Sequence, residues 1–278
     1  VVPAIGCTEP IAVALCVAKA TEALGAKPEK IDVLLSANIL KNAMGVGIPG
    51  TGMIGLPIAI ALGALIGKSE YQLEVLKDSN PAAVEEGKRF IGEKRIDISL
   101  KKNITEKLYI EVCCKSGGNK ATAIIAGGHT TFIYIARNGD VLLNKQSAGC
   151  GEEEAQVAGL TLRKVYDFAM NAPLDEIRFI LETACLNKAA AERSFDGNYG
   201  HGLGRMLRGN YEHKILGDSV FSHILSYTSG ACDARMAGAM IPVMSNSGSG
   251  NQGISATLPV LVYAEENGKS EEELIRAL

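Results

Sequence analysis

A cysteine in a polar turn is the residue of this chain most suited to chemistry. Cys7 lies in the segment Gly6–Pro10, which reads GCTEP, and Pro10 suits the first turn of a helix. A thiol at a helix start has its thiolate form favoured by the helix dipole. We therefore predict Cys7 to be a reactive thiol and Glu9 beside it to bind substrate. The alternative is a buried cysteine that acts only as a small apolar side chain.

A second candidate is the segment Ile241–Gly253, which reads IPVMSNSGSGNQG. Its glycines allow the backbone to come close to a ligand, and its polar side chains offer donors and acceptors. The apolar run Ile254–Tyr263 predicts a helix after it, and the free N–H groups of a helix start favour an anion such as a carboxylate. The predicted binding residues are Ser245, Asn246, Ser247, Ser249, Asn251 and Gln252. An ordinary solvated turn is the alternative.

This segment also matches G-x-G-x-x-G at Gly248–Gly253, which invites a dinucleotide interpretation. The acidic residue expected about 20 positions later would be Glu265 or Glu266, inside a polar break instead of at the end of a second strand. Nucleotide binding is therefore a minor alternative.

Two further segments contain candidate substrate-binding residues. Lys41 and Asn42 open a second glycine-rich segment, KNAMGVGIPGTGMIG, where the lysine could neutralise a carboxylate or be merely solvated. His129 lies in GGHTT between two strand-like runs, where it could bind substrate or cap a turn. The chain has no C-x-x-C pair and no two histidines at ligand spacing, so we predict no complete metal site within it.

Composition restricts the class of protein. The 278 residues are 47% hydrophobic with a net charge of −3, enough for a large core but without a basic face for nucleic acid. No run of about 18 apolar residues predicts a membrane span. Seven irregularly spaced cysteines and no signal peptide favour a reducing compartment, so we expect a cytoplasmic protein with a small-molecule partner. The chain starts without methionine and stops in a helix-like pattern, so we expect both ends to be cuts from a longer protein.

The pattern of the chain predicts an α+β fold. An alanine-rich helix follows Pro10 and closes at Gly25, a strand covers Lys30–Asn38, and helices cover Leu56–Ile66 and Asn80–Gly92. Strand-like runs follow Arg95, with a tight hairpin at Asn138-Gly139, and helical patterns resume after Gly149. We predict a helical catalytic domain at 1–29 plus 147–278, interrupted by an inserted α+β domain at 30–146. Such an arrangement would bring Cys7 near Ser245 in one cleft.

Five motifs together resemble the L-cysteine desulfidase family, which is similar to the iron–sulfur L-serine dehydratases. They are GCTEPIA at Gly6–Ala12, KNAMGVGIPGT at Lys41–Thr51, GGHTT at Gly127–Thr131, DARMAG at Asp233–Gly238 and SNSGSGNQG at Ser245–Gly253. The resemblance implies a lyase that eliminates hydrogen sulfide from L-cysteine without pyridoxal phosphate (PLP), giving pyruvate and ammonia. It also implies a [4Fe-4S] cluster that holds the leaving group, and it assigns the removal of the α-proton to Cys7. A cluster-ligand role for Cys7 is the rival interpretation.

The chain departs from the family because the cysteine-containing segment expected to hold the cluster has no counterpart before Leu278. We expect those ligands beyond Leu278, which makes an inactive fragment one interpretation of this chain. An L-serine dehydratase-type deaminase and a non-catalytic amino-acid-binding or regulatory protein are the alternatives. A homo-oligomer is also left open.

Overall fold

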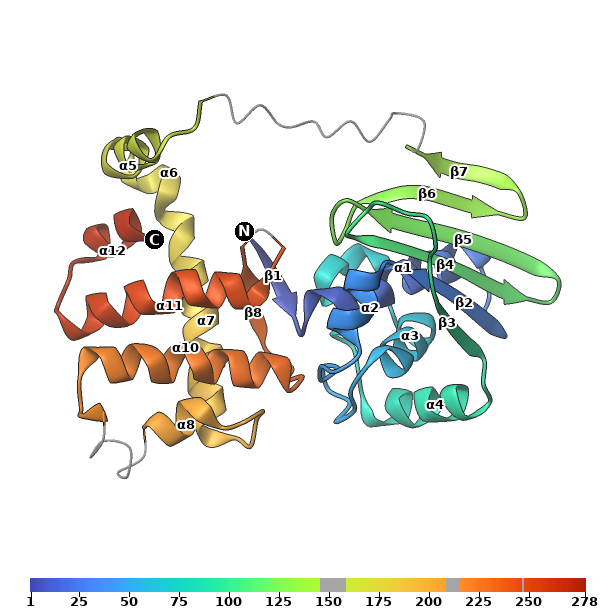
Figure 1. The fold of residues 1–278 in the computed structure, drawn as a ribbon, viewed down its shortest axis with the longest axis horizontal. Helices are drawn as coiled ribbons and strands as arrows, with labels where there is room; N and C mark the ends of the chain where they lie inside the picture. The colour runs from blue at the N-terminus through green and yellow to red at the C-terminus, as the bar shows by residue number, and fades with distance from the viewer. Residues whose placement is uncertain (146–158, 209–215, 247) are drawn as a thin grey trace. The chain divides into compact units, whose positions relative to one another are not determined.

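The structure is a computed structural model that describes residues 1–145, 159–208, 216–246 and 248–278. The chain folds into two compact units. The sheet unit contains Pro3–Ser147 and Arg235–Ile241, and the helical unit contains Val1–Val2, Ala148–Ala234 and Pro242–Leu278. The predicted mixture of helices and strands is confirmed (Figure 1).

The elements of the first half include most of the strands. In chain order they are β1 (Val2–Ile5), α1 (Thr8–Leu24), β2 (Lys30–Leu35), α2 (Ala37–Ala43), α3 (Leu56–Leu65), η1 (Ser69–Glu74), α4 (Pro81–Gly92), β3 (Ile96–Leu100), β4 (Tyr109–Ser116), β5 (Asn119–Ala126), β6 (Phe132–Arg137) and β7 (Asp140–Asn144). The predicted hairpin at Asn138-Gly139 is confirmed, because both residues have the positive φ (52° and 98°) that such a tight turn needs.

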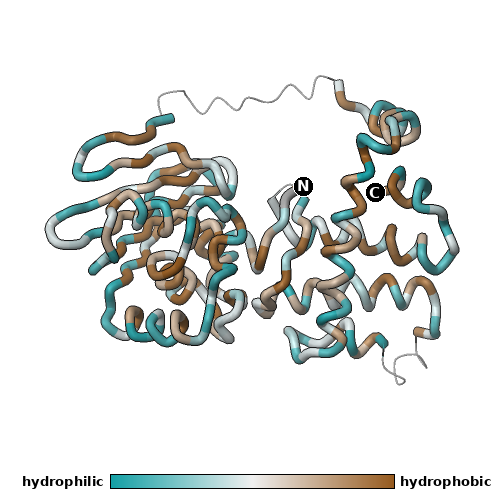
Figure 2. Tube along the Cα trace, turned by 180° about the vertical axis from the view of Figure 1, so that it is seen from behind, coloured by the Kyte–Doolittle hydropathy of each residue, from teal (hydrophilic) through white to brown (hydrophobic). Residues whose placement is uncertain are grey.

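A six-stranded sheet forms the frame of the sheet unit, in the order β3-β2-β4-β5-β6-β7. β2 and β3 are parallel, which requires the crossover through α2, α3 and α4, and the other pairs are antiparallel. Helix α1 packs against β4, β5 and α3, and α3 packs against α4 (Figure 1). Figure 2 shows hydrophobic segments along the strands and these helices, with hydrophilic turns at the outside.

Helix α1 lies in the middle of the core of the sheet unit. Its sequence is apolar on nearly every side, and residues from Ile11 to Ala18 are at most 1% exposed. A helix that is apolar all round must be covered all round. The sheet covers one side of α1 and α3 another, so α1 belongs to the sheet unit, whereas we predicted residues 1–29 to group with the later helices.

Helix α2 is a second difference from the predicted pattern. We expected a strand as far as Asn38 and a loop from Lys41 onward, but β2 ends at Leu35 and the helix Ala37–Ala43 follows. Ser36 has the extended backbone of an N-cap residue (φ −64°, ψ 157°) and ends the strand there. Lys41 and Asn42 therefore lie on a helix, which fixes the direction of their side chains.

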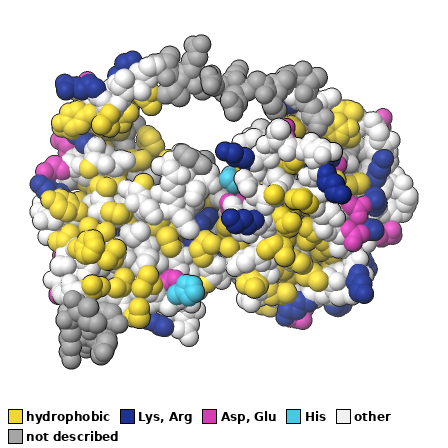
Figure 3. Space-filling view, viewed as in Figure 1, with side chains coloured by type: hydrophobic (Ala, Val, Ile, Leu, Met, Phe, Trp, Pro, Cys, Tyr) yellow, Lys and Arg dark blue, Asp and Glu magenta, His cyan; other side chains and the backbone are white. Residues whose placement is uncertain are grey.

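The helical unit contains most of the elements of the second half. They are α5 (Leu162–Asn171), α6 (Leu174–Ile177), η2 (Arg178–Ile180), α7 (Leu181–Asp196), α8 (Leu203–Leu207), α10 (Val220–Met236), β8 (Pro242–Ser245), α11 (Gly250–Glu266) and α12 (Glu271–Ala277). Helix α7 packs on β8 and α11, and α11 on α12. Helix α5 has no buried residue, and its Leu162 and Phe168 are exposed. Figure 3 shows hydrophobic side chains at the surface of this part of the molecule. None of the helices in the described ranges is long and apolar enough to cross a bilayer.

Candidate functional site

Cys7 is the N-cap residue of α1, and its side chain is 5% exposed. The preceding Gly6 has φ 78°, and a Cβ atom at this residue would lie 2.5 Å from Cγ of Pro49. Only glycine therefore allows this turn to pack against the second glycine-rich segment. The start of α1 and the segment around Pro49 thus hold the thiol in a fixed place.

Glu9, in the first turn of α1, accepts three side-chain hydrogen bonds. The Sγ atom of Cys7 donates to its Oε2 atom across 3.0 Å, and Thr8 Oγ1 donates to the same oxygen across 3.1 Å. Nδ2 of Asn42, on α2, donates to Oε1 across 3.3 Å. The structure therefore brings together three of the motif residues, Cys7, Glu9 and Asn42, at one carboxylate.

The predicted preference of Cys7 for the thiolate was wrong. Burial, and next the negative charge of Glu9, raise the pKa of the Cys7 thiol to about 12, although the charge of Arg235 acts to lower it. The helix dipole is a smaller effect than the loss of hydration in a site this closed. Cys7 is a neutral thiol at pH 7 and donates its proton to the hydrogen bond with Glu9.

Glu9 is the charged partner of this pair. Burial acts to raise its pKa, but the hydrogen bonds from Cys7 and Thr8 and from the backbone outweigh burial and lower the pKa below its ordinary value. A carboxylate is stabilised as an anion by such donors. Glu9 is therefore ionised at pH 7.

His129 belongs to the same neighbourhood. It lies in the turn between β5 and β6, where Thr131 N donates to Gly128 O across 3.1 Å. Burial lowers the pKa of His129, Glu9 acts to raise it, and Arg235 acts to lower it. The imidazole is therefore neutral at pH 7 and lies within the electrostatic reach of both charges.

Arg235, near the end of α10, is a functional candidate that we did not predict. Its side chain is 4% exposed, and its charge acts on both Cys7 and His129. Gly47 N donates to Met236 O across 2.9 Å, which attaches this part of the chain to the second glycine-rich segment. The sequence did contain a signal for Arg235, which lies among small residues in DARMAG. Most arginines lie at the protein surface, so such a setting is uncommon for this residue type.

Lys41 and the segment Ser245–Gly253 were predicted with this group. Lys41 is exposed at the end of α2. The segment Ser245–Gly253 belongs to the helical unit, and Cys7 to the sheet unit. The single cleft shared by Cys7 and this segment stays a prediction.

In the segment Ser245–Gly253, a tight turn joins β8 to α11. Asn246 and Ser249 exchange two backbone hydrogen bonds, with N···O distances of 3.0 and 2.9 Å. Ser249 is the N-cap residue of α11, and its Oγ accepts from Gln252 N across 3.3 Å. The predicted helix after this segment is confirmed. Asn251 lies in the first turn of α11, and Ser247 lies outside the described residues.

Close packing holds this turn in place. A Cβ atom at Gly253 would lie 2.0 Å from Met244 O. Met244 N in turn donates to Oδ1 of Asn187, on α7, across 2.9 Å. The cavity beside the turn has a volume of about 40 Å³, little more than one water molecule.

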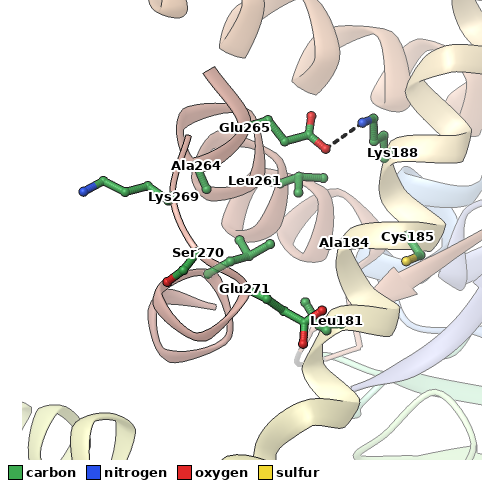
Figure 4. A pocket seen from close by; sticks show the side chains of 11 residues that line it. Leu181, Ala184, Cys185, Lys188, Leu261, Ala264, Glu265, Lys269, Ser270 and Glu271 are labelled. Carbon is green, nitrogen blue, oxygen red and sulfur yellow. Dashed lines mark hydrogen bonds and ion pairs between the residues drawn. The ribbon is translucent and has the colours of Figure 1, made fainter. Parts of the chain in front are cut away.

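A larger cavity of about 510 Å³ lies between α7, α11 and α12 (Figure 4). Its lining is mostly apolar, including Leu181, Leu261 and Leu274, and Lys188 forms an ion pair with Glu265 across 2.7 Å. None of the predicted site residues lines it.

The described cysteines do not form a metal site. Within residues 1–145, 159–208, 216–246 and 248–278, no three Cys, His, Asp or Glu side chains are placed to hold a metal ion. Cys16 and Cys114 are buried in the sheet unit and Cys185 is exposed in the helical unit, while Cys150 lies outside the described residues. These residues do not fit a [4Fe-4S] cluster, which takes three or four clustered thiolates.

The fold combines helices and strands, and the Cys7–Glu9 pair in the sheet unit is its candidate site. The family model described as serine dehydratase alpha chain matches residues 70–278, and the chain belongs to this family.

Curated relatives extend the match to the whole chain. A UPF0597 protein of Bacteroides fragilis is 82% identical over all 278 residues, which are 65% of its own length. UPF0597 proteins of Bacteroides thetaiotaomicron and Porphyromonas gingivalis are 79% and 52% identical, again over 100% of this chain and 65% and 66% of their own lengths. The chain therefore spans less than two thirds of the length of these relatives. No solved structure matches this chain.

Proposed function

We propose that the full-length protein is a PLP-independent lyase that eliminates hydrogen sulfide from L-cysteine, giving pyruvate and ammonia. The observation that carries this proposal is the hydrogen bond from the buried Cys7 thiol to the ionised Glu9 carboxylate. An acid–base pair of this kind suits removal of a proton from carbon. Membership of the serine dehydratase alpha chain family supports an elimination at an amino acid.

Cys7 is the proposed base. Its thiolate takes the α-proton, the electron pair of the Cα–H bond forms the Cα=Cβ bond, and the Cβ–S bond breaks as the sulfur departs with its electron pair. Aminoacrylate remains, and its imine form reacts with water to give pyruvate and ammonia. Because a thiol is a far better proton acceptor after ionisation, Cys7 must lose its own proton before this step.

The other predicted residues bind and orient the substrate in this proposal. Glu9, Asn42 and His129 lie together in the sheet unit, with Lys41 on the same helix as Asn42. The polar residues at the start of α11, among them Ser249 and Asn251, hold the substrate carboxylate, since a helix start favours an anion. Such positioning lowers a reaction barrier by up to roughly 7–11 kcal/mol in the best cases.

We also propose that the full-length protein uses a [4Fe-4S] cluster, which would bind the departing sulfur. The described residues do not supply its ligands. We place these ligands in the part of the protein beyond Leu278, and none of the steps above depends on them.

L-Serine is the second candidate substrate, and the family name favours it. The test is anaerobic purification of the full-length protein, iron and sulfide analysis, and pyruvate formation from L-cysteine and from L-serine. Faster turnover of L-cysteine supports the desulfidase. A preference for L-serine would assign the protein as a serine dehydratase, and no pyruvate from either amino acid in a protein with an intact cluster would contradict the proposed reaction.

A further inference from the structure

The Glu9 carboxylate is a partly buried negative charge with neutral partners. Its three side-chain donors are the Cys7 thiol, the Thr8 hydroxyl and the Asn42 amide. Among the described residues, no lysine or arginine forms an ion pair with Glu9. Glu111, in the same unit, instead pairs with Lys101 across 2.6 Å. A partly buried carboxylate without a cation is costly unless a ligand provides the opposite charge.

The titratable groups near Glu9 do not supply this charge. His129 is neutral at pH 7 because burial lowers its pKa. Arg235 is positive, but its charge acts on Cys7 and His129. A negative and a positive group in one neighbourhood match an α-amino acid, which carries an ammonium and a carboxylate group on the same carbon.

We propose that Glu9 binds the α-ammonium group of the amino-acid substrate and that this binding makes Cys7 available as a base. The inference rests on the proposed function, because it assigns one half of the substrate to a named carboxylate. It also gives Glu9 a definite role: it selects α-amino acids over thiols or acids that lack the amino group.

The charge of Glu9 also acts on the proton of Cys7. In the free protein, burial, this charge and the hydrogen bond to Glu9 together hold the proton on the Cys7 sulfur. An ammonium group at Glu9 neutralises the charge and competes for the oxygen that accepts from Cys7. The pKa of the Cys7 thiol is thereby lowered, and a larger fraction of the thiol gives its proton to solvent water. The base is therefore produced after the substrate has bound.

The experiment uses two non-reactive probes, L-alanine and propionate, which differ only in the amino group. The dissociation constant of each probe from the full-length protein is measured by isothermal titration calorimetry. We expect L-alanine to bind about 10- to 100-fold more tightly than propionate, since hydrogen bonds to charged groups are worth roughly 1.5–3 kcal/mol. Neither probe can undergo elimination, so the result does not depend on turnover.

Substitutions at Glu9 then test the assignment. Glu9→Gln removes the negative charge and should abolish the preference for L-alanine. Glu9→Asp keeps a carboxylate and should retain part of the preference. Glu22→Gln is the matched control, because Glu22 is also on α1 and accepts hydrogen bonds, from Ser69, away from Cys7. This control should keep the preference.

The outcomes separate this inference from the proposed reaction. An unchanged preference for L-alanine in Glu9→Gln, or no preference in the native protein, would overturn the ammonium site even if L-cysteine is turned over. Loss of the preference in Glu9→Gln alone would support the site even if neither L-cysteine nor L-serine gives pyruvate.

Discussion

Cys7 and Glu9 lie two residues apart at the start of α1, with 3.0 Å between the thiol sulfur and Oε2 of the carboxylate. At pH 7 the carboxylate is ionised and the thiol is neutral, and the pKa values of the two groups are moved further apart than usual. Because Glu9 both accepts the thiol proton in a hydrogen bond and opposes its loss, a change at Glu9 alters the chemistry of Cys7 directly.

Replacing Cys7 by serine should abolish elimination in the full-length protein while leaving the fold intact. A hydroxyl of similar size keeps the hydrogen bond to Glu9 but is a far poorer base, and loss of a general base reduces turnover by about 100-fold or more. Pyruvate formation and circular dichroism measure the two effects. Cys185→Ser, at an exposed position on α7, is the control and should retain activity. Near-normal turnover by Cys7→Ser would remove Cys7 from the mechanism, and loss of iron along with activity would make it a cluster ligand.

The Glu9→Gln variant should react faster with iodoacetamide at Cys7. Burial is the main cause of the raised Cys7 pKa of about 12, and the charge of Glu9 is the next. Removing the charge lowers the thiol pKa, so the thiolate fraction at any pH below the thiol pKa increases. Alkylation rates between about pH 8 and 10 measure this change, since ordinary thiols ionise near pH 8.5. Slower alkylation than in the native protein would show that Glu9 promotes ionisation of Cys7.

His223, on α10, should stabilise the helical unit in a pH-dependent way. A hydrogen bond to Glu266 raises its pKa above 6.5, burial opposes this, and a bond to Asp218 adds to it; both N···O distances are 2.7 Å. Because the folded pKa is raised, the stabilisation is complete below the unfolded pKa near 6.5 and is lost as pH rises through the folded pKa.

The test is the free energy of unfolding of His223→Gln against pH. The variant should be less stable than the native protein by about 0.5–1 kcal/mol near pH 6, as for exposed ion pairs, and equally stable at about pH 9. High salt should reduce the difference because exposed charges are screened. A difference that grows with rising pH would contradict the prediction.

Gly253→Ala should disrupt the turn between β8 and α11. The added Cβ atom would lie 2.0 Å from Met244 O, and this backbone atom cannot move without displacing β8. Overpacking of this kind typically costs about 1–3 kcal/mol, occasionally more. Thermal unfolding measures the loss. Gly92→Ala, at the end of α4 with no atom within 4 Å of the new methyl group, is the control and should be close to neutral.

Local patterns in the sequence were sufficient to predict most elements. The helix of α1, its end at Gly25, the strands after Arg95 and the hairpin at Asn138-Gly139 all followed from helix propensity, alternation and turn chemistry. These features depend on neighbours within a few residues. The motifs around Cys7, Asn42 and His129 could be found in the same way, because their residue types are unusual for purely structural segments.

The grouping of those motifs and the charge state of Cys7 were decided by tertiary structure. Asn42 reaches Glu9 because α2 begins after Ser36. Arg235 belongs to the same unit because the end of α10 is attached there, where Gly47 N donates to Met236 O. The thiol is neutral because burial removes its hydration, and the dipole of one helix does not offset that loss. Burial depends on every element that packs around a residue, so the residue types near Cys7 could indicate a reactive thiol but could not determine its pKa.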